Sequence, residues 1–189
     1  NKPLIYWSII KAIKSKNIDY TWVSSDSKKI LNKSAKFGAK IIERPKKLST
    51  DKSLSELSWI HAINHIKKNY KIKTAVAIQP TSPIRSKNDF DNSISYFNKK
   101  KLDSLFSCNR TYNQNIWTYK NKILKPTFNL KKKRIPRQAE PQYFCENGSF
   151  WIFNVKKFLK HKTRLFGKIG KHVMDNKCSF QIDDPLDLK

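Results

Sequence analysis

Segments with helical periodicity alternate with short apolar segments over most of the first 108 residues. This alternation predicts an α/β fold of three layers, in which helices cover both faces of a mostly parallel sheet joined by right-handed crossovers. A strand at 149–154 resumes the core, which closes near 179–184. The predicted helices cover about 3–13, 27–37, 53–66 and 88–99, and the other predicted strands cover 20–24, 39–43, 74–79 and 104–108.

Three helix ends carry recognisable local signals. Pro3 suits the first turn of a helix, and Gly38 suits the position just after one. Ser53 and Glu56 form a capping-box pattern, which predicts that the third helix starts at Ser53.

The alternation stops between about Asn109 and Tyr143. Aromatic and basic residues, short β-like pieces such as 116–119 and the block 131–134 replace it. A structureless loop of this length is improbable inside a compact domain, so we expect an arm that packs on a partner subunit.

The run from Gln79 to Arg85 has the composition of a binding site. It follows the apolar segment Ala75–Ile78, which predicts a buried parallel strand. Two prolines fix the backbone just where the strand ends, and ligands of open α/β sheets bind outside the carboxyl ends of the strands. The amide of Gln79, two hydroxyl groups and the guanidinium of Arg85 therefore predict a polar site, with a plain proline-rich turn as the alternative.

Seven segments, in this order along the chain, resemble the CMP-sialic acid synthetases, that is, the N-acylneuraminate cytidylyltransferases and their nonulosonic-acid relatives. The resemblance implies a Rossmann-like nucleotidyltransferase sheet in one domain spanning 1–189, with a dimerisation arm at about 109–143 and a homodimer. The segments are KPLIYWSI at 2–9, VSSDSKKI at 23–30, ERPKKLSTD at 43–51, QPTSPIR at 79–85, RQAEP at 137–141, ENGSFWIF at 146–153 and QIDDPLDL at 181–188.

The resemblance also implies an activity: transfer of CMP from CTP to the anomeric hydroxyl of a 2-keto sugar acid, with Mg²⁺ and release of pyrophosphate. It implies that Arg44 and Ser55 hold the cytosine and that Gln79 contacts the sugar acid. Arg85 is a further substrate-binding candidate, because only six of the 40 basic residues are arginines and it lies in a matched segment.

Four residues of the later segments complete the candidate site. Arg137 resembles a family arginine that reaches into the active site of the partner subunit, where we expect a catalytic role. Tyr143, Asn147 and Trp151 lie around the family's sugar pocket, and core packing is the alternative for them.

Asp183 is the candidate metal ligand and a candidate catalytic residue. The family usually has two aspartates separated by one residue here, and residues two apart in an extended segment face the same side. Two such carboxylates can hold Mg²⁺. This chain has Gln181 in place of the first aspartate, which leaves the metal site one negative charge short.

Composition bounds the remaining alternatives. A chain of 189 residues that is 38% hydrophobic suits one domain, and no apolar run is long enough to cross a membrane. The three cysteines lack metal-site spacing, which predicts buried thiols in a cytoplasmic protein. The net charge of +26 raises the alternative of a nucleic-acid-binding module, but we expect neither a nucleic-acid nor a membrane partner, because the lysines are scattered and no nucleic-acid motif accompanies them.

His61 and His65 lie one helical turn apart without a third ligand, so we expect a structural role.

Two further expectations follow from the resemblance. The family's first strand and its glycine-rich phosphate loop would precede residue 1, so the chain resembles a fragment clipped at both ends that is inactive alone. A second function is therefore also open, that of a non-catalytic or degenerate nucleotide-binding homologue.

Overall fold

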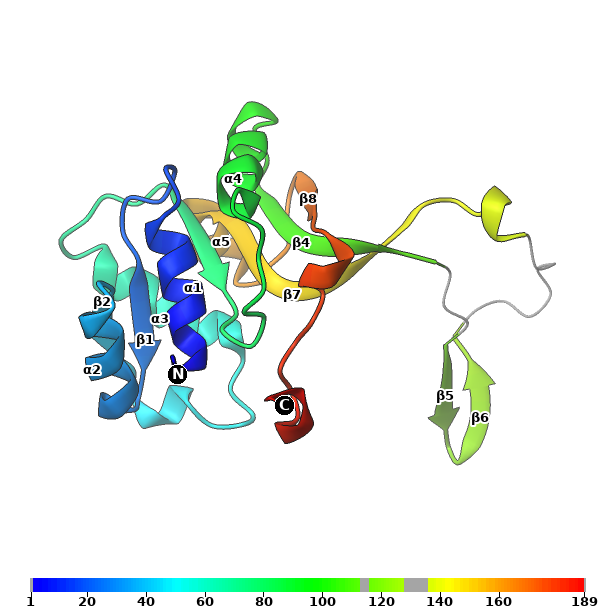
Figure 1. Cartoon of the computed structure of the whole chain (residues 1–189), viewed down its shortest axis with the longest axis horizontal. Helices are drawn as coiled ribbons and strands as arrows, with labels where there is room; N and C mark the ends of the chain where they lie inside the picture. The colour runs from blue at the N-terminus through cyan, green and yellow to red at the C-terminus, as the bar shows by residue number, and fades with distance from the viewer. Residues whose placement is uncertain (1, 113–115, 128–135, 189) are drawn as a thin grey trace.

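A computed structural model describes residues 2–112, 116–127 and 136–188 (Figure 1). Its helices and strands alternate as the periodicity predicts. In chain order the elements are α1 (Leu4–Ile13), β1 (Trp22–Ser25), α2 (Lys28–Lys36), β2 (Lys40–Glu43), η1 (Lys46–Leu48), α3 (Ser55–Ile66), β3 (Thr74–Ile78), α4 (Asp89–Lys99), β4 (Ser104–Thr111), β5 (Trp117–Lys120), β6 (Ile123–Pro126), η2 (Arg137–Ala139), β7 (Tyr143–Asn154), α5 (Val155–His161), β8 (Ile169–Val173), η3 (Asn176–Cys178) and η4 (Pro185–Leu188).

The strands of the body form two sheets. Strands β1 and β2 pair in parallel, and a second sheet has the order β3-β7-β4-β8. Strand β7 is antiparallel to β3 and β4, whereas β8 is parallel to β4, so three of these four strands share one direction. The predicted α/β class is confirmed. The sequence predicts one sheet, but β1 and β2 form a sheet that is separate from the four-stranded sheet of β3, β7, β4 and β8.

Strand β7 has a separate cluster of buried residues on each face, because successive side chains of a strand point to opposite sides. Phe150 and Ile152 pack with residues of α1 and α4, whereas Trp151 and Phe153 pack with residues of α3 and α5. Helices therefore cover both faces of the larger sheet, which gives the three layers.

Strands β4 and β7 run beyond the body as a two-stranded ribbon. They pair from Ser104 and Phe153 to Thr111 and Tyr143, so both strands continue past the predicted 104–108 and 149–154 into the arm. Strands β5 and β6 form an antiparallel hairpin, which Figure 1 shows set apart from the body. The described pieces of the predicted arm thus protrude. The basic block 131–134 lies outside the described residues.

Two local predictions were wrong. Helix α3 begins at Ser55 without a side-chain cap, because the Ser53 hydroxyl bonds to the hydroxyl and N–H of Thr50 and Glu56 pairs with Arg164. Strand β3 was predicted to be buried, but all five of its residues are half-buried, because the strand has β7 as its neighbour on one side and a cavity on the other.

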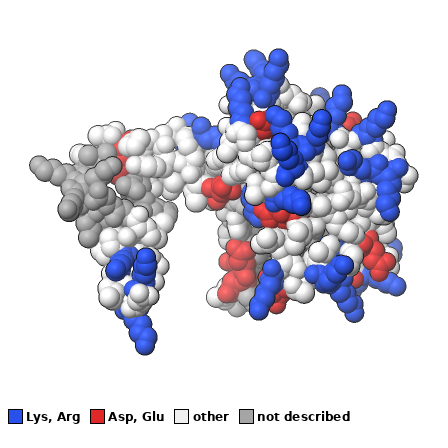
Figure 2. Space-filling model, turned by 180° about the vertical axis from the view of Figure 1, so that it is seen from behind, with Lys and Arg blue, Asp and Glu red and all other residues white. Residues whose placement is uncertain are grey.

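The surface carries the positive charge in dispersed form. Figure 2 shows Lys and Arg spread over the visible face of the body with Asp and Glu between them. Among the described residues, no helix has the length and apolar character needed to cross a membrane. Cys108 and Cys178 are buried as predicted, but Cys145 is exposed.

Candidate active site

A cavity of about 920 Å³, which we call the central groove, lies between β1 and β3. Both strands line it over their whole length, and residues of α1 and α3 line it from the two helical layers. At the carboxyl ends of β1 and β3 the lining is polar, and along the strands it is largely apolar. The polar end is formed by Arg44, Ser49, Thr50, Ser53, Ser55 and Gln79.

Three predicted substrate-binding residues meet at the polar end. Arg44 follows β2, and its Nε donates to the Ser49 hydroxyl at 2.9 Å. Ser55 is the first residue of α3, where backbone N–H groups have no partner within the helix. Gln79 follows β3, and its N–H donates to Ser149 O at 2.9 Å, which holds the turn against β7. Local strand and helix ends therefore bring together a cation, a hydroxyl and an amide.

Arg85 points into the protein instead of into the groove. It is 4% exposed, and its guanidinium donates to Gln79 O at 2.7 Å, to the hydroxyl and carbonyl of Ser149 at 2.9 and 3.0 Å, and to the Ser8 hydroxyl at 3.0 Å. Burial lowers the pKa of Arg85 to about 10, so the group stays charged at neutral pH. Arg85 thus ties the turn at Gln79 to β7 and α1.

Asp183 lies in a segment that runs beside this turn. The N–H of Ile182 donates to Thr81 O at 2.8 Å, and the Asp187 carboxylate accepts from the N–H of Asp183 at 2.9 Å. The carboxylate of Asp183 is exposed and has no hydrogen-bond or ion-pair partner among the described residues. Gln181 instead donates its side-chain amide to Asn147 O.

Asn147 and Trp151 belong to the interior of the described chain. Asn147 is 6% exposed and its amide bonds to the side chains of Ser107 and Asn109, both at 2.7 Å. Trp151 packs against Trp59 and donates its indole N–H to Glu146 at 3.1 Å. These contacts are those of core packing, the alternative that the sequence left open for both residues.

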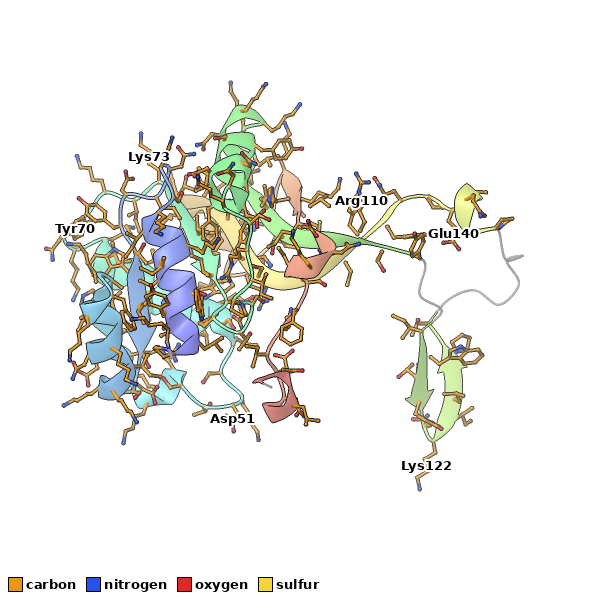
Figure 3. All side chains as sticks on the ribbon, in the orientation of Figure 1. Asp51, Tyr70, Lys73, Arg110, Lys122 and Glu140 are labelled. Atoms are coloured by element: carbon orange, nitrogen blue, oxygen red, sulfur yellow. The ribbon has the colours of Figure 1, made fainter. Side chains whose placement is uncertain are left out.

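Arg137 and Tyr143 lie on the arm. The backbone of Arg137 starts η2, and its side chain lies outside the described residues. Figure 3 shows Glu140, shortly after η2, out on the arm, whereas Asp51, in the loop before α3, lies on the body. Within one subunit, the arm therefore does not bring Arg137 to the groove.

Sequence reasoning missed Ser8 and Ser149 as supports of the turn. Both bond to Arg85, and both lie inside matched segments, which was a signal available in the sequence.

Among the described residues, no cluster of three or more His, Cys, Asp or Glu side chains could hold a metal ion.

A family model described as Cytidylyltransferase matches residues 1–168. The N-acylneuraminate cytidylyltransferase of Escherichia coli is 27% identical over 100% of this chain and 45% of its own length. The Campylobacter jejuni CMP-N,N'-diacetyllegionaminic acid synthase is 26% identical over 98% of this chain and 81% of its own length. The chain spans less than half the length of the Escherichia coli relative and of the N-acylneuraminate cytidylyltransferase A of Danio rerio.

Solved structures share the fold. A CMP:2-keto-3-deoxy-manno-octonic acid synthetase complexed with CTP superposes with a TM-score of 0.69 at 10% identity, covering 100% of this chain and 85% of that one. The 4-diphosphocytidyl-2C-methyl-D-erythritol synthase of Anaerococcus prevotii gives a TM-score of 0.65 at 12% identity, covering 99% and 83%. Together with the match over residues 1–168, these findings mean that the chain belongs to the cytidylyltransferase family.

Proposed function

We propose that the protein takes part in transferring CMP from CTP to the anomeric hydroxyl of a nonulosonic, sialic-like acid. The observation that carries the proposal is the meeting of Arg44, Ser55 and Gln79 at the polar end of the central groove in a cytidylyltransferase. In the transfer, the anomeric oxygen forms a bond to the α-phosphorus of CTP and its hydroxyl proton is released to water. The bond from that phosphorus to the bridging oxygen breaks, and pyrophosphate leaves.

The residues at the polar end have matching tasks. Arg44 and Ser55 hold the cytosine, whose carbonyl oxygen and ring nitrogen accept hydrogen bonds. Gln79 orients the sugar acid, and Arg85 fixes the backbone of Gln79 from behind without contacting substrate. Reactions of this kind depend chiefly on positioning and on neutralising charge, so a rigid turn is an advantage.

Mg²⁺ is the proposed cofactor, and Asp183 is the residue that would hold it. The fit is partial: the Asp183 carboxylate is exposed and unpaired among the described residues, but the side-chain amide of Gln181 is engaged with Asn147 O. When bound, the ion would neutralise phosphate charge. Asp183 would supply one carboxylate to the ion, and phosphate oxygens and water would supply its other ligands.

The proposed assembly is a homodimer in the cytoplasm. The protruding arm supports the dimer, because its hairpin exposes apolar side chains such as Tyr119 and Ile123. Crossing of the arm would place Arg137, and with it Tyr143, near the groove of the partner subunit, where Arg137 could pair with the sugar carboxylate through two hydrogen bonds. The free thiols of Cys108 and Cys178 are in keeping with a reducing compartment.

A nucleotide titration tests the proposal. CTP, UTP, ATP and GTP are added in turn to residues 1–189 while backbone amide shifts are recorded by NMR. CTP is expected to shift Arg44, Ser55 and Gln79 at lower concentration than the other nucleotides, and Arg44→Lys should weaken that response. Equal responses to all four nucleotides, or shifts confined to surface lysines, would remove the basis of the proposal.

Gln181 motivates a second candidate, a non-catalytic nucleotide-binding homologue. Residue 181 is where the family usually has the first of two metal-binding aspartates, and here the Gln181 amide donates to Asn147 O instead. The two functions differ in one readout: both predict selective CTP binding, but only the enzyme predicts that Mg²⁺ tightens CTP binding through Asp183. Loss of that Mg²⁺ effect in Asp183→Asn, with CTP binding in its absence unchanged, would favour the enzyme.

A further inference from the structure

Arg164 is held against two tryptophan rings on the face of the larger sheet that α3 and α5 cover. Its Cζ lies 4.7 Å from the centre of the Trp151 ring and 5.4 Å from that of the Trp59 ring. Its Nε donates to the Glu56 carboxylate at 2.7 Å. The two rings and the ion pair fix the plane of the guanidinium, so little side-chain freedom is left to lose when a ligand binds.

The other nitrogens of this guanidinium are available to a ligand. The side chain of Arg164 is 36% exposed, and its Nε is the nitrogen that bonds to Glu56. Within the described part of the chain, Nη1 and Nη2 have no hydrogen-bond partner. Their N–H groups lie in one plane, which is the geometry that binds the two oxygens of a carboxylate.

The strand register brings Gln79 to the same face of the sheet. Ala77 pairs with Trp151 and packs in the same cluster, whereas Ile78 packs on the opposite face. Gln79 precedes a proline, which favours an extended backbone, and its N–H continues the pairing with β7. Because side chains alternate along an extended segment, the side chain of Gln79 follows that of Ala77 on the face that carries Arg164.

Arg164 also lies near the polar end of the central groove. Its partner Glu56 follows Ser55 in the first turn of α3, and Trp59, one turn later, lines the groove. A cytosine held by Ser55 therefore has the Arg164 guanidinium nearby on the side of α3. The chain has 40 basic residues, of which six are arginines, and a lysine could not stack in this way or offer two parallel donors.

We propose that Arg164 is a further substrate-binding residue, which binds the carboxylate of the sugar acid. The inference rests on the proposed function and extends it. Gln79 and Arg164 hold the acid from two elements of one subunit, and Glu56 positions the guanidinium. A carboxylate has lone pairs for more than one arginine, so this contact is compatible with the one proposed for Arg137.

An acid and its ester test the inference in the unaltered protein. N-acetylneuraminic acid and its methyl ester are titrated into residues 1–189, with and without CTP. NMR records the indole N–H of Trp59 and of Trp151 and the Nε–H of Arg164. The acid should shift these signals and bind at least about tenfold more tightly than the ester, which lacks only the charged carboxylate. An arginine with a purely structural role would not distinguish the two ligands.

Two variants and a matched control assign the effect to Arg164. Arg164→Lys keeps the charge without the planar fork, and Arg164→Leu removes both. Each should weaken binding of the acid by about tenfold or more and leave binding of the ester nearly unchanged. Lys160→Ala removes an exposed positive charge of α5 and should change neither affinity.

Equal binding of acid and ester, or an unchanged affinity for the acid in both Arg164 variants, would overturn the inference. Stronger binding of pyrophosphate than of the acid at Arg164 would also overturn it, because the residue would then serve the leaving group. The CTP response of Arg44 and Ser55 is read separately. Its absence counts against the proposed function, whereas its presence without a response of Arg164 to the acid counts against this inference alone.

Discussion

Arg85 carries a positive charge in the interior and uses hydroxyl and carbonyl oxygens as its hydrogen-bond acceptors. Its guanidinium joins α1, the turn after β3 and strand β7, three elements that are far apart in the sequence. The planar fork of arginine can reach all of these acceptors at once, whereas an ammonium group cannot.

Replacing Arg85 by alanine is expected to lower the free energy of unfolding by about 3–5 kcal/mol, because several buried acceptors lose their donors. Arg85→Lys should recover part of this loss. Urea denaturation measures both variants, with Arg110→Ala as the control for an exposed arginine that lies on the ribbon (Figure 3). A loss for Arg85→Ala no larger than that of the control would show that the bonds contribute little.

Gln181 is a second residue whose neighbours decide its role. Gly148 has a φ of +63°, a conformation that favours glycine, and a Cβ added there would lie 2.6 Å from the Gln181 amide nitrogen. Gln181 thus fastens the segment before Asp183 onto β7.

Gln181→Asp should destabilise the protein by about 1–3 kcal/mol without Mg²⁺, because a carboxylate cannot donate to Asn147 O. If Gln181 faces the metal position, added Mg²⁺ should raise the Tm of this variant more than that of the wild type, since two carboxylates would then share the ion. Gln181→Asn serves as the matched control, because asparagine has the size of aspartate without its charge. Identical Mg²⁺ responses in all three proteins would place Gln181 outside the metal shell.

At the scale of elements, α3 carries a histidine whose side chain is half-buried. His61 is half-buried, and its Nδ1 has no partner among the described residues. Its pKa lies below the ordinary value of 6.5 because burial disfavours the charged form, and nearby His65, Arg44 and Lys68 add repulsion.

The sign of the pH effect follows from this shift. Below pH 6.5 the unfolded chain takes up a proton that the folded chain resists, so stability should fall as the pH falls through that value. His61→Gln should flatten this part of the curve, as measured by urea denaturation between about pH 5 and 8. His161→Gln, on α5, is the control. An unchanged slope in His61→Gln would refute the assignment.

The β5–β6 hairpin is an element with little cover of its own. Tyr119 is 73% exposed, and Ile123 and Leu124 are 59% and 52% exposed. Such apolar surface favours burial against another subunit.

Replacing Ile123 and Leu124 by serine should shift the proposed dimer towards monomer, which sedimentation velocity would detect as a lower weight-average coefficient. Leu186→Ser replaces a leucine of η4 that is even more exposed, at 69%, and should leave the assembly unchanged. A dimer that persists in the hairpin variant would exclude this hairpin from the interface.

Some elements could be predicted from sequence because their signals are local, and others could not because they depend on distant partners. The periodicity of Ile5, Ile9 and Ala12 predicts α1 with no knowledge of its neighbours. The buried state of Asn147 depends on Asn109 and Met174, which periodicity does not bring together. The sequence around Ser53 fits a capping box, but the Ser53 hydroxyl bonds to the Thr50 hydroxyl and does not cap the helix.

At the scale of the whole molecule, the net charge of +26 is spread over a surface with few acidic groups. Helix α2 shows this imbalance most clearly, because it has exposed lysines three and four residues apart and contains no Asp or Glu. Like charges at these spacings repel, and the field of the whole molecule adds to the repulsion.

Replacing Lys33 by glutamate turns its two like-charge pairs, with Lys29 and Lys36, into opposite-charge pairs and should therefore raise the Tm by about 1–3 °C at low salt. The gain should shrink as NaCl shortens the Debye length from about 30 Å at 0.01 M to about 3 Å at 1 M. Lys33→Gln, which removes the charge without reversing it, should give a smaller gain. A gain that is independent of salt would point to helix propensity as its cause.

Strand β7 lies between β3 and β4, and it follows both of them along the chain. A ribosome therefore completes β3 and β4 before the strand that joins them exists. Until β7 emerges, the apolar residues of both strands have no pairing partner, which is the condition in which nascent chains need a chaperone or begin to aggregate. The arm between β4 and β7 lengthens this interval, so the length of the arm sets how long the two strands wait for their partner.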